Sequence, residues 1–273
     1  MINALVVVYN KKAENSPTCM SLLRQAGCNL KVYLWDNSDG DHNLEESCRS
    51  YGWTYLGGKG NRGLSEAYNE TVSILRKNYD SNDFFCPLDD DTVLPDDYFA
   101  GAETIIGNNG MKIFVPVVCS ESSILSPWRE NTVKSRRFFK DEDEIMSSDL
   151  NDCLAFNSGM LIPLSVFENE SLQYDERLFM DGVDISFLRN AKNAGIAMCV
   201  YPQTVRHSFS ANSHYDEETS INRFKTYVDD MKVCFEAKPF TGRYLVLKRA
   251  IRLTFRYRNT VFIKIAFGNG GNR

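Results

Sequence analysis

Asp89, Asp90 and Asp91 form an uninterrupted acidic triplet that directly follows a short apolar run. Carboxylates this close repel one another unless a cation lies among them. Mg²⁺ and Mn²⁺ favour oxygen ligands, and both commonly use one or two carboxylates while leaving positions for the phosphates of a substrate. In open α/β sheets ligands bind beyond the carboxyl ends of the strands, so the triplet predicts a site for a divalent metal and a phosphate. A solvated acidic loop, or the N-cap of a helix beginning near Asp96, is the alternative.

Asp181 and Asp184 form a second acidic pair, at the start of a helix expected over Val183–Ala194. Three residues apart on a helix, both side chains can face one side, where neighbouring carboxylates raise each other's pKa. Such a pair suits a general base that takes a proton from a hydroxyl group. The helix dipole also favours acids in the first turn of any helix, so a purely structural role is the alternative.

These acids need a scaffold, and the chain alternates apolar, β-rich runs with segments of helical character. Strands that alternate with helices of roughly 10–15 residues predict a parallel, doubly wound α/β sheet. The polar segment 120–150 is expected to be a mobile surface loop. The expected strands are Leu5–Val8, Leu30–Trp35, Thr54–Leu56, Phe84–Leu88, Lys112–Val118, Ala155–Pro163 and Ala197–Tyr201. The expected helices before the second acidic pair are Pro17–Ala26, Leu44–Tyr51 and Leu64–Lys77.

Polar residues also follow the first two expected strands, with Tyr9 and Asn10 after the first and Asp36 at the end of the second. Asp36 is suited to accept a hydrogen bond from the imide N–H of a uracil or thymine ring, and Asn10 to read a base carbonyl. Taken alone, these residues fit turn chemistry as well, because Asn, Asp, Ser and Gly dominate turns for conformational reasons.

A glycine-rich segment, 57–63, leads into the third expected helix. Free backbone N–H groups at a helix start favour anions, and Arg62 adds positive charge beside Asn61. The segment lacks the Lys-Ser/Thr ending of a Walker loop and the three spaced glycines of the dinucleotide fingerprint. It therefore predicts anion binding outside those two nucleotide-binding classes.

Length and composition limit the class of protein. The 273 residues are 43% hydrophobic, enough for one large core. Eight cysteines without a CxxC pair indicate reduced, mostly buried thiols rather than disulfides or zinc ligands. No apolar run approaches the roughly 18 residues of a membrane span, and the chain begins directly with its first strand, so we expect a cytoplasmic protein.

Charge divides the chain into an acidic body, 1–236, and a basic extension, 237–273. The extension holds nine Lys or Arg and no acid, which leaves a net charge of about −14 on the body. Within 240–265, Tyr244, Ile251 and Phe255 recur at helical spacing beside several arginines. This pattern is typical of an amphipathic helix that lies on anionic lipid headgroups. Packing on the domain or in a homo-oligomer is the alternative, and the acidic body disfavours nucleic acid as a partner.

Several short segments stand in one order and at characteristic spacings. They are Val6-Val7-Val8-Tyr9-Asn10, Asp36-Asn37-Ser38, Asn61-Arg62-Gly63 with Ala67 and Asn69, Leu88-Asp89-Asp90-Asp91-Thr92, Asn157-Ser158-Gly159, Phe179-Met180-Asp181-Gly182-Val183-Asp184, Ala194-Gly195 and Val205-Arg206-His207. With these segments, from about residue 4 to about residue 210, the chain resembles the inverting glycosyltransferases of family two, and within it the bacterial rhamnosyltransferase-like members. One position departs from the pattern, because Asn190 stands where an arginine is usual and Arg189 lies one residue early.

The resemblance implies the GT-A fold, a Rossmann-like and mostly parallel sheet flanked by helices, here with a helical basic extension at the C-terminus. It implies Mn²⁺ or Mg²⁺ held by Asp91 and His207. It implies Asp184 as the general base with Asp181 in support, and Ser158 and Gly159 lining the cleft for sugar and acceptor. The sugar nucleotide would contact Tyr9, Asn10, Asp36, Asn61, Arg62, Asp89 and Asp90.

The function implied is that of a hexosyltransferase, which moves a sugar from a UDP- or dTDP-sugar to a hydroxyl of a glycan acceptor. Relatives that build bacterial surface polysaccharides, such as lipopolysaccharide O-antigen or capsule, often use polyprenyl-diphosphate-linked acceptors at the inner face of the cell membrane. Peripheral attachment there would fit the basic extension. Two alternatives remain: a sugar-1-phosphate nucleotidyltransferase, which is expected to carry a glycine-rich basic loop where this chain has Asn10–Glu14, and a non-catalytic protein that binds sugar nucleotides or glycans.

Overall fold

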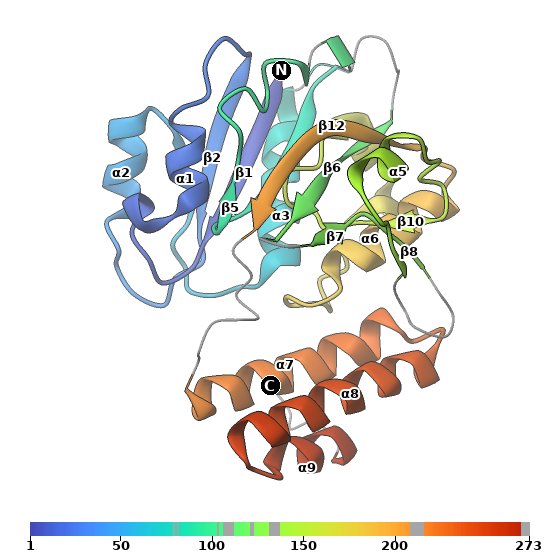
Figure 1. Ribbon diagram of the computed structural model, residues 1–273. Coiled ribbons are helices and arrows are strands. Elements are labelled where there is room, and N and C mark those ends of the chain that lie inside the picture. Colours follow the sequence, from blue (N-terminus) through green and yellow to red (C-terminus); the bar gives the residue numbers. More distant parts are fainter. Residues whose placement is uncertain are drawn as a thin grey trace.

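One sheet of the protein has five strands, in the order β11-β4-β1-β2-β3. Two of them, β1 and β2, lie side by side in Figure 1. β1 pairs in parallel with β2 and β4, β3 pairs in parallel with β2, and β11 is antiparallel to β4. The register places Asp36 opposite Val8 and Asp89 opposite Val7. The predicted site residues therefore lie together at the carboxyl ends of the parallel strands. The strands are β1 (Ile2–Val8), β2 (Leu30–Asp36), β3 (Thr54–Gly57), β4 (Phe84–Asp89) and β11 (Ile162–Pro163). The computed structural model describes residues 1–78, 80, 82–102, 104–105, 112–120, 123–130, 137–207 and 216–268.

Helices cover both faces of this sheet. One face packs against α1 and α2 through Leu22 and Leu44, and the other packs against α3 through Tyr68 and Val72. Every residue of β1 is buried, as expected for a central parallel strand covered on both sides. The helical elements of the N-terminal part of the chain are η1 (Ala13–Asn15), α1 (Pro17–Leu22), α2 (Leu44–Tyr51), α3 (Leu64–Leu75) and η2 (Arg76–Asn78).

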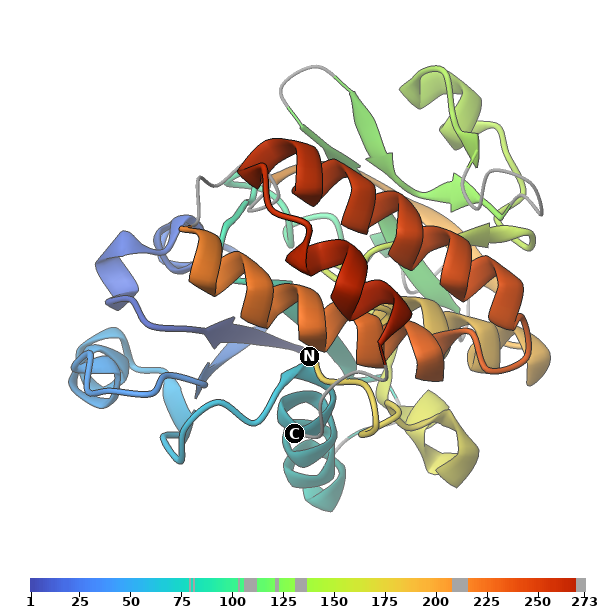
Figure 2. The same cartoon turned by 90° about the horizontal axis from the view of Figure 1, so that it is seen from below.

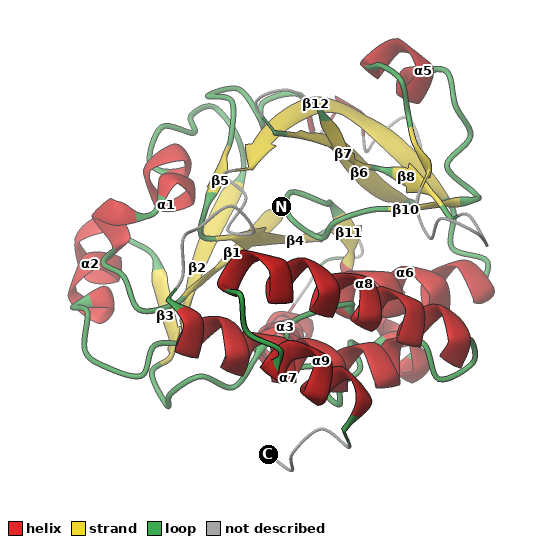
Figure 3. Ribbon diagram, turned by 60° about the horizontal axis from the view of Figure 1, so that its bottom comes forward, coloured by secondary structure: helices red, strands yellow, loops and turns green. Residues whose placement is uncertain are grey.

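A second sheet, β5-β12-β6-β7, lies beside the first, with a small sheet, β10-β8-β9, at its edge (Figure 3). β12 runs parallel to β6 and antiparallel to β5, the two-residue strand that directly follows the acidic triplet. His207 therefore lies opposite Thr92 and next to the acids. The elements are β5 (Thr92–Val93), β6 (Ile113–Cys119), β7 (Ile124–Ser126), β8 (Trp128–Arg129), β9 (Arg137–Phe138), α5 (Glu142–Met146), β10 (Cys153–Leu154), η3 (Leu164–Glu168), η4 (Glu170–Leu172), α6 (Val183–Asn193) and β12 (Met198–His207).

Three C-terminal helices, α7 (Glu217–Cys234), α8 (Pro239–Tyr257) and α9 (Val261–Phe267), pack together at one end of the molecule (Figure 1). Figure 2 shows them from that end, in orange and red. Phe224, Val246 and Phe262, one from each helix, share a core. The division at 236/237 stays a prediction, and this core joins α7 to α8 across it. None of the described helices has both the length and the apolar character needed to span a bilayer.

Several expected elements differ from the structure. The interpretation of 120–150 as a mobile loop is wrong for its described part, which forms β7, β8, β9 and α5 and buries Trp128, Phe139 and Ile145. The single strand expected over Ala155–Pro163 is wrong too, because only β11 at its end is a strand. Apolar runs this short are buried in loops as readily as in strands, so periodicity cannot separate the two. Residues 96–101 form turns rather than the beginning of a helix.

Candidate active site

The acidic triplet sits in a turn between β4 and β5 that buried hydroxyl groups hold in place. Thr18 Oγ1 accepts a hydrogen bond from Thr92 N (2.8 Å) and also contacts the carbonyl oxygen of Asp89. Ser158 Oγ accepts from Asp89 N (3.1 Å) and lies 2.7 Å from Thr92 Oγ1. Thr18 on α1 and Ser158 in the loop before β11 therefore fix the backbone of the turn from two sides.

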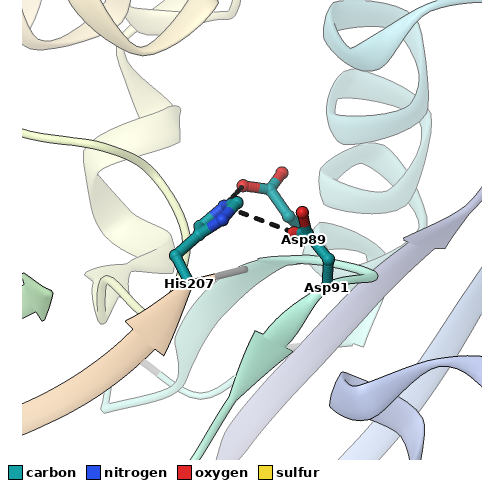
Figure 4. Close-up of side chains that lie close together, drawn as sticks. All are labelled: Asp89, Asp91 and His207. Atoms are coloured by element: carbon teal, nitrogen blue, oxygen red, sulfur yellow. Dashed lines mark hydrogen bonds and ion pairs between the residues drawn. The ribbon is translucent and has the colours of Figure 1, made fainter. Parts of the chain in front are cut away.

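Asp89, Asp91 and His207 converge on one point (Figure 4). His207 Nε2 lies 3.1 Å from Asp89 Oδ2 and 3.3 Å from Asp91 Oδ1, and all three ligand atoms fall within 4.8 Å of one another. Two carboxylates and an imidazole form a donor set that suits Mn²⁺ or a similar divalent cation. The antiparallel pairing of β5 with β12 is what brings the histidine to the acids.

The electrostatics of this cluster are those of a site that lacks positive charge. Burial raises the pKa of Asp91 to about 6, with Asp89 and Asp90 adding to the shift and His207 opposing it. Burial favours the neutral imidazole of His207, but its hydrogen bond to Asp89 and the nearby acidic charges outweigh that effect and raise its pKa. A proton on His207 and a divalent cation are two ways of compensating the same carboxylates.

Asp90 points away from this cluster. Its Oδ1 lies 2.9 Å from Lys11 Nζ, and its Oδ2 accepts a hydrogen bond from Tyr9 N (3.2 Å). Burial raises the pKa of Asp90, while Lys11 opposes the shift. Asp90 therefore ties the end of β4 to the end of β1, and a direct contact with the nucleotide stays a prediction. Sequence reasoning missed Lys11, because the two adjacent lysines of this polar turn, Lys11 and Lys12, carry no pattern that singles out one of them.

The residues predicted to bind the base lie together at the ends of β1 and β2. Asp36 Oδ1 accepts from Ser38 N and its Oδ2 accepts from Tyr55 Oη, both at 2.9 Å. Asn10 Oδ1 accepts from Asp39 N (3.0 Å), and Tyr9 Oη donates to the Asp39 carboxylate (2.9 Å). Asp36, Asp39 and Tyr55 line an open cavity of about 550 Å³, whereas Tyr9 and Asn10 are not among its lining residues. The contacts of these residues with a base stay predictions.

Asn61 and Arg62 stabilise the loop before α3. Asn61 Oδ1 accepts from Asn37 Nδ2 (2.9 Å) and from the Gly63 backbone (3.2 Å). The Arg62 guanidinium contacts Glu66 and Glu70 on α3. A phosphate would have to compete with these two carboxylates, so the predicted phosphate contact of Arg62 remains a prediction.

The second acidic pair lies where α6 begins. Asp181 precedes Gly182, the left-handed residue before the helix, and Asp184 is in the first turn, where its Oδ1 accepts from Ile185 N (2.8 Å). Asp181 Oδ1 lies 3.5 Å from Arg249 Nη1, and its Oδ2 is buried without a hydrogen-bond partner among the described residues. Burial raises the pKa of the Tyr68 phenol, and both Asp89 and Asp184 add to that shift. Tyr68 is therefore within electrostatic reach of both acidic groups.

Ser158 and Gly159 were predicted to line the cleft for sugar and acceptor. Ser158 is fully buried and supports the turn that carries the triplet. Gly159 has a φ of +88°, and a Cβ there would lie 2.6 Å from the Tyr98 hydroxyl, which donates to the Gly159 carbonyl. Both residues thus shape the floor beneath the acids, and direct contact with a ligand stays a prediction.

Comparison with known proteins agrees with this architecture. The profile described as "Glycosyl transferase family 2" matches residues 4–164, more than half of the chain. The fold is similar to that of S. aureus TarS (TM-score 0.56, 12% identity, 97% of this chain and 54% of TarS). A TarS fragment of residues 1–349 in complex with UDP gives a TM-score of 0.55 at 12% identity, over 97% of this chain and 89% of the fragment.

A third similar structure is the mannosyltransferase PcManGT from Pyrobaculum calidifontis in complex with GDP-Man and Mn²⁺, with a TM-score of 0.56 at 14% identity, over 98% of this chain and 76% of that protein. At these identities the likeness concerns the fold. The chain spans about half the length of TarS, the first of these proteins. A comparison with the sequences of curated proteins finds no match. The family match and the common architecture identify the chain as a member of glycosyl transferase family 2 with the GT-A fold.

Proposed function

We propose that the protein is a metal-dependent, inverting glycosyltransferase that moves a sugar from a UDP- or dTDP-sugar to a hydroxyl group of a glycan acceptor. The observation that carries the proposal is the convergence of Asp89, Asp91 and His207 at the edge of the sheet where β1, β2 and β4 end. The family assignment favours glycosyl transfer over the nucleotidyltransferase and the non-catalytic alternatives.

Asp91 and His207 would hold Mn²⁺ or Mg²⁺, and Asp89 would lie between the metal and the ribose. A divalent cation at this point neutralises charge that grows on a diphosphate leaving group. The neighbouring structures support a nucleotide-sugar donor, because TarS fragments are described with UDP and UDP-GlcNAc and PcManGT with GDP-Man and Mn²⁺. A pyrimidine base is our choice for this chain because of Asp36 and Asn10.

Asp184 would take the proton from the acceptor hydroxyl. It stands at the helix start, within electrostatic reach of the same tyrosine as Asp89. Asp181 would orient the acceptor from the turn before α6, where Arg249 Nη1 lies 3.5 Å from its Oδ1. The acceptor oxygen would bond to the anomeric carbon as the bond from that carbon to the nucleoside diphosphate breaks. This direct displacement inverts the configuration at the anomeric carbon.

For the acceptor we propose a lipid-linked glycan of a bacterial surface polysaccharide, O-antigen or capsule, with the rhamnosyltransferase-like members as the nearest subgroup. Support comes from α8, whose outer face combines Phe240 (83% exposed) and Phe255 (79% exposed) with Arg243, Arg252 and Arg256. An exposed face of aromatic and basic residues suits the headgroup region of an anionic membrane. The protein would then work peripherally, at the cytoplasmic face of the membrane.

The test is thermal unfolding of the wild type with UDP-, dTDP- and GDP-sugars, each with and without Mn²⁺. A ligand that binds only the folded state stabilises it, by about 2.7 kcal/mol at 100 times its Kd. We expect one pyrimidine nucleotide sugar to raise Tm in the presence of Mn²⁺ only. Equal stabilisation with and without the metal would contradict the metal-dependent mechanism.

A further inference from the structure

Asp230, on α7, is a fully buried carboxylate that binds the backbone of the segment carrying the second acidic pair. We propose that Asp230 is a positioning residue, which fixes the segment 179–182 and thereby the direction of Asp181 and Asp184. The proposal rests on the proposed function for its catalytic consequence. It assigns to the C-terminal helices a part in the active site.

Three consecutive amides donate to this one side chain. Asp230 Oδ1 accepts from Phe179 N, and Oδ2 accepts from Met180 N and Asp181 N, each at 2.9 Å. Hydrogen bonds to an ionised acceptor are roughly twice as strong as neutral ones. One side chain therefore satisfies three backbone groups of a segment that belongs to no helix or strand.

Packing alone does not explain why a carboxylate is buried at this position, because burying a charge costs free energy. Burying an ion costs several kcal/mol, and an apolar residue of similar size often serves stability equally well. Directional bonds to consecutive amides are what the carboxylate adds. They fix where the backbone lies, and Asp181 is itself one of the three donors.

Two further contacts fasten the same segment. A Cβ at Gly182 (φ +83°) would lie 2.8 Å from Cys234 Sγ, so α7 packs directly on the turn into α6. On the other side, Phe179 O accepts from Leu64 N at 2.7 Å, where α3 begins. The segment 179–182 therefore lies between α3 and α7. Asp230 contributes the side-chain hydrogen bonds that keep the segment in this place.

The test compares Asp230→Asn with Asp229→Asn, a matched change at the neighbouring residue, whose carboxylate pairs with Lys232 on the surface of α7. Asn keeps the size of the side chain but replaces one acceptor oxygen by an N–H donor. Misplacing a catalytic group by about 1 Å can cost 100-fold in rate, so we expect kcat to fall roughly 10- to 100-fold in Asp230→Asn. KM for the donor should stay within about twofold, and Asp229→Asn should match the wild type.

A second readout does not depend on activity. Hydrogen exchange of the amides of Phe179, Met180 and Asp181 should accelerate at least about tenfold in Asp230→Asn and remain unchanged in Asp229→Asn, because only the first change replaces one of their two acceptor oxygens and removes the charge of the other. If the wild type transfers no sugar, this measurement still decides whether Asp230 fixes the segment, while the proposed function fails separately.

If Asp230→Asn does not fold, the wild type alone answers the question. With increasing denaturant, the three amides should begin to exchange together with those of α7 rather than with those of α6. Exchange together with α6 would overturn the proposal. So would an unchanged kcat in folded Asp230→Asn, or parallel losses of kcat and donor affinity, which indicate a general structural role.

Discussion

The three acids of the triplet are adjacent in sequence and differ in their surroundings. Asp89 and Asp91 face His207, whereas Asp90 faces Lys11 and the backbone of Tyr9. The turn after β4 therefore sends alternate carboxylates to one side and the middle one to the other. Two of the three acids are available to a metal, and the third stabilises the strand ends.

Replacing Asp91 by Ala should weaken Mn²⁺ binding at least about 100-fold, because loss of a direct ligand exceeds the 10- to 100-fold typical of supporting residues. Calorimetric titration with Mn²⁺ measures the effect. The control is Asp97→Ala, since Asp97 is an exposed acid a few residues further along the same chain segment. Equal Mn²⁺ affinity in the two variants would remove Asp91 from the metal site.

Replacing Asp184 by Asn should lower kcat by roughly 10²- to 10⁴-fold, the range for loss of a general base, while donor affinity is kept. Asp181→Asn should act mainly on KM for the acceptor. Steady-state kinetics with both substrates varied, together with the thermal shift produced by the donor, separates these effects. Loss of donor stabilisation in Asp184→Asn would place this residue in the donor site instead.

At the scale of elements, close packing requires a glycine at position 63 in the loop before α3. Gly63 has a φ of +81°, and a Cβ there would lie 2.7 Å from the carbonyl oxygen of Phe179. Gly60 has a similar φ of +84° but nothing within 4 Å of its Cβ position. Gly63 also has a ψ of 178°, in a region that is essentially reserved for glycine, so both its conformation and its packing resist a side chain.

Gly63→Ala should therefore destabilise the protein by about 1–3 kcal/mol more than Gly60→Ala, the usual cost of overpacking. The strain of placing an alanine in a backbone region that is essentially reserved for glycine adds to this difference at Gly63. Chemical denaturation of the two variants measures it. Equal stabilities would show that the contact between the loop and Phe179 is loose.

The elements with strong local patterns were the ones that sequence analysis predicted well. The helix expected over Leu44–Tyr51 has those bounds, and the parallel strands lie within a few residues of their expected positions. The prediction of a mobile loop over 120–150 was wrong, because the strands in this segment are two or three residues long and show no periodicity. The pairing of β5 with β12 joins residues more than 110 apart and has no local signature either.

Asp230 shows why part of the site escaped sequence analysis. It stands beside Asp229 on a helix rich in charge, which is typical of a solvated face. A signal was nevertheless present, because Tyr227, Asp230 and Cys234 follow the three- and four-residue spacing of a buried helix face. An acid on such a face needs buried partners, and these lie some fifty residues earlier in the chain.

At the scale of the whole molecule, an acidic body carries a basic group of helices whose outer face is exposed. α8 turns Val246 and Ala250 toward α7 and α9, while Phe240 and Phe255 remain largely exposed. The sequence left open whether this helix packs on protein or on a membrane. Tyr257, at the end of α8, packs against Phe262, whereas Phe240, Tyr244 and Phe255 are exposed, which favours an external partner for that face.

The double variant Phe240→Ser/Phe255→Ser should bind phosphatidylglycerol vesicles at least about tenfold more weakly than the wild type, because two aromatic side chains no longer enter the headgroup region. Co-sedimentation measures binding, and added salt should weaken it further through screening of the arginines. Phe138→Ser is the control, since this phenylalanine is 46% exposed in β9, outside the C-terminal helices. Unchanged vesicle binding in the double variant would contradict a membrane role for Phe240 and Phe255 and would favour a protein partner for this face of α8.

The most direct test of the whole account is transfer itself, followed as nucleoside diphosphate release and as growth of a polyprenyl-diphosphate-linked glycan, with UDP- and dTDP-sugars as donors. The account predicts release and growth in equal amounts by the wild type with Mn²⁺ or Mg²⁺. It predicts neither after chelation of the metal, and neither in Asp184→Asn, which should still bind the donor. Transfer that survives chelation, or that proceeds at the wild-type rate in Asp184→Asn, would contradict it.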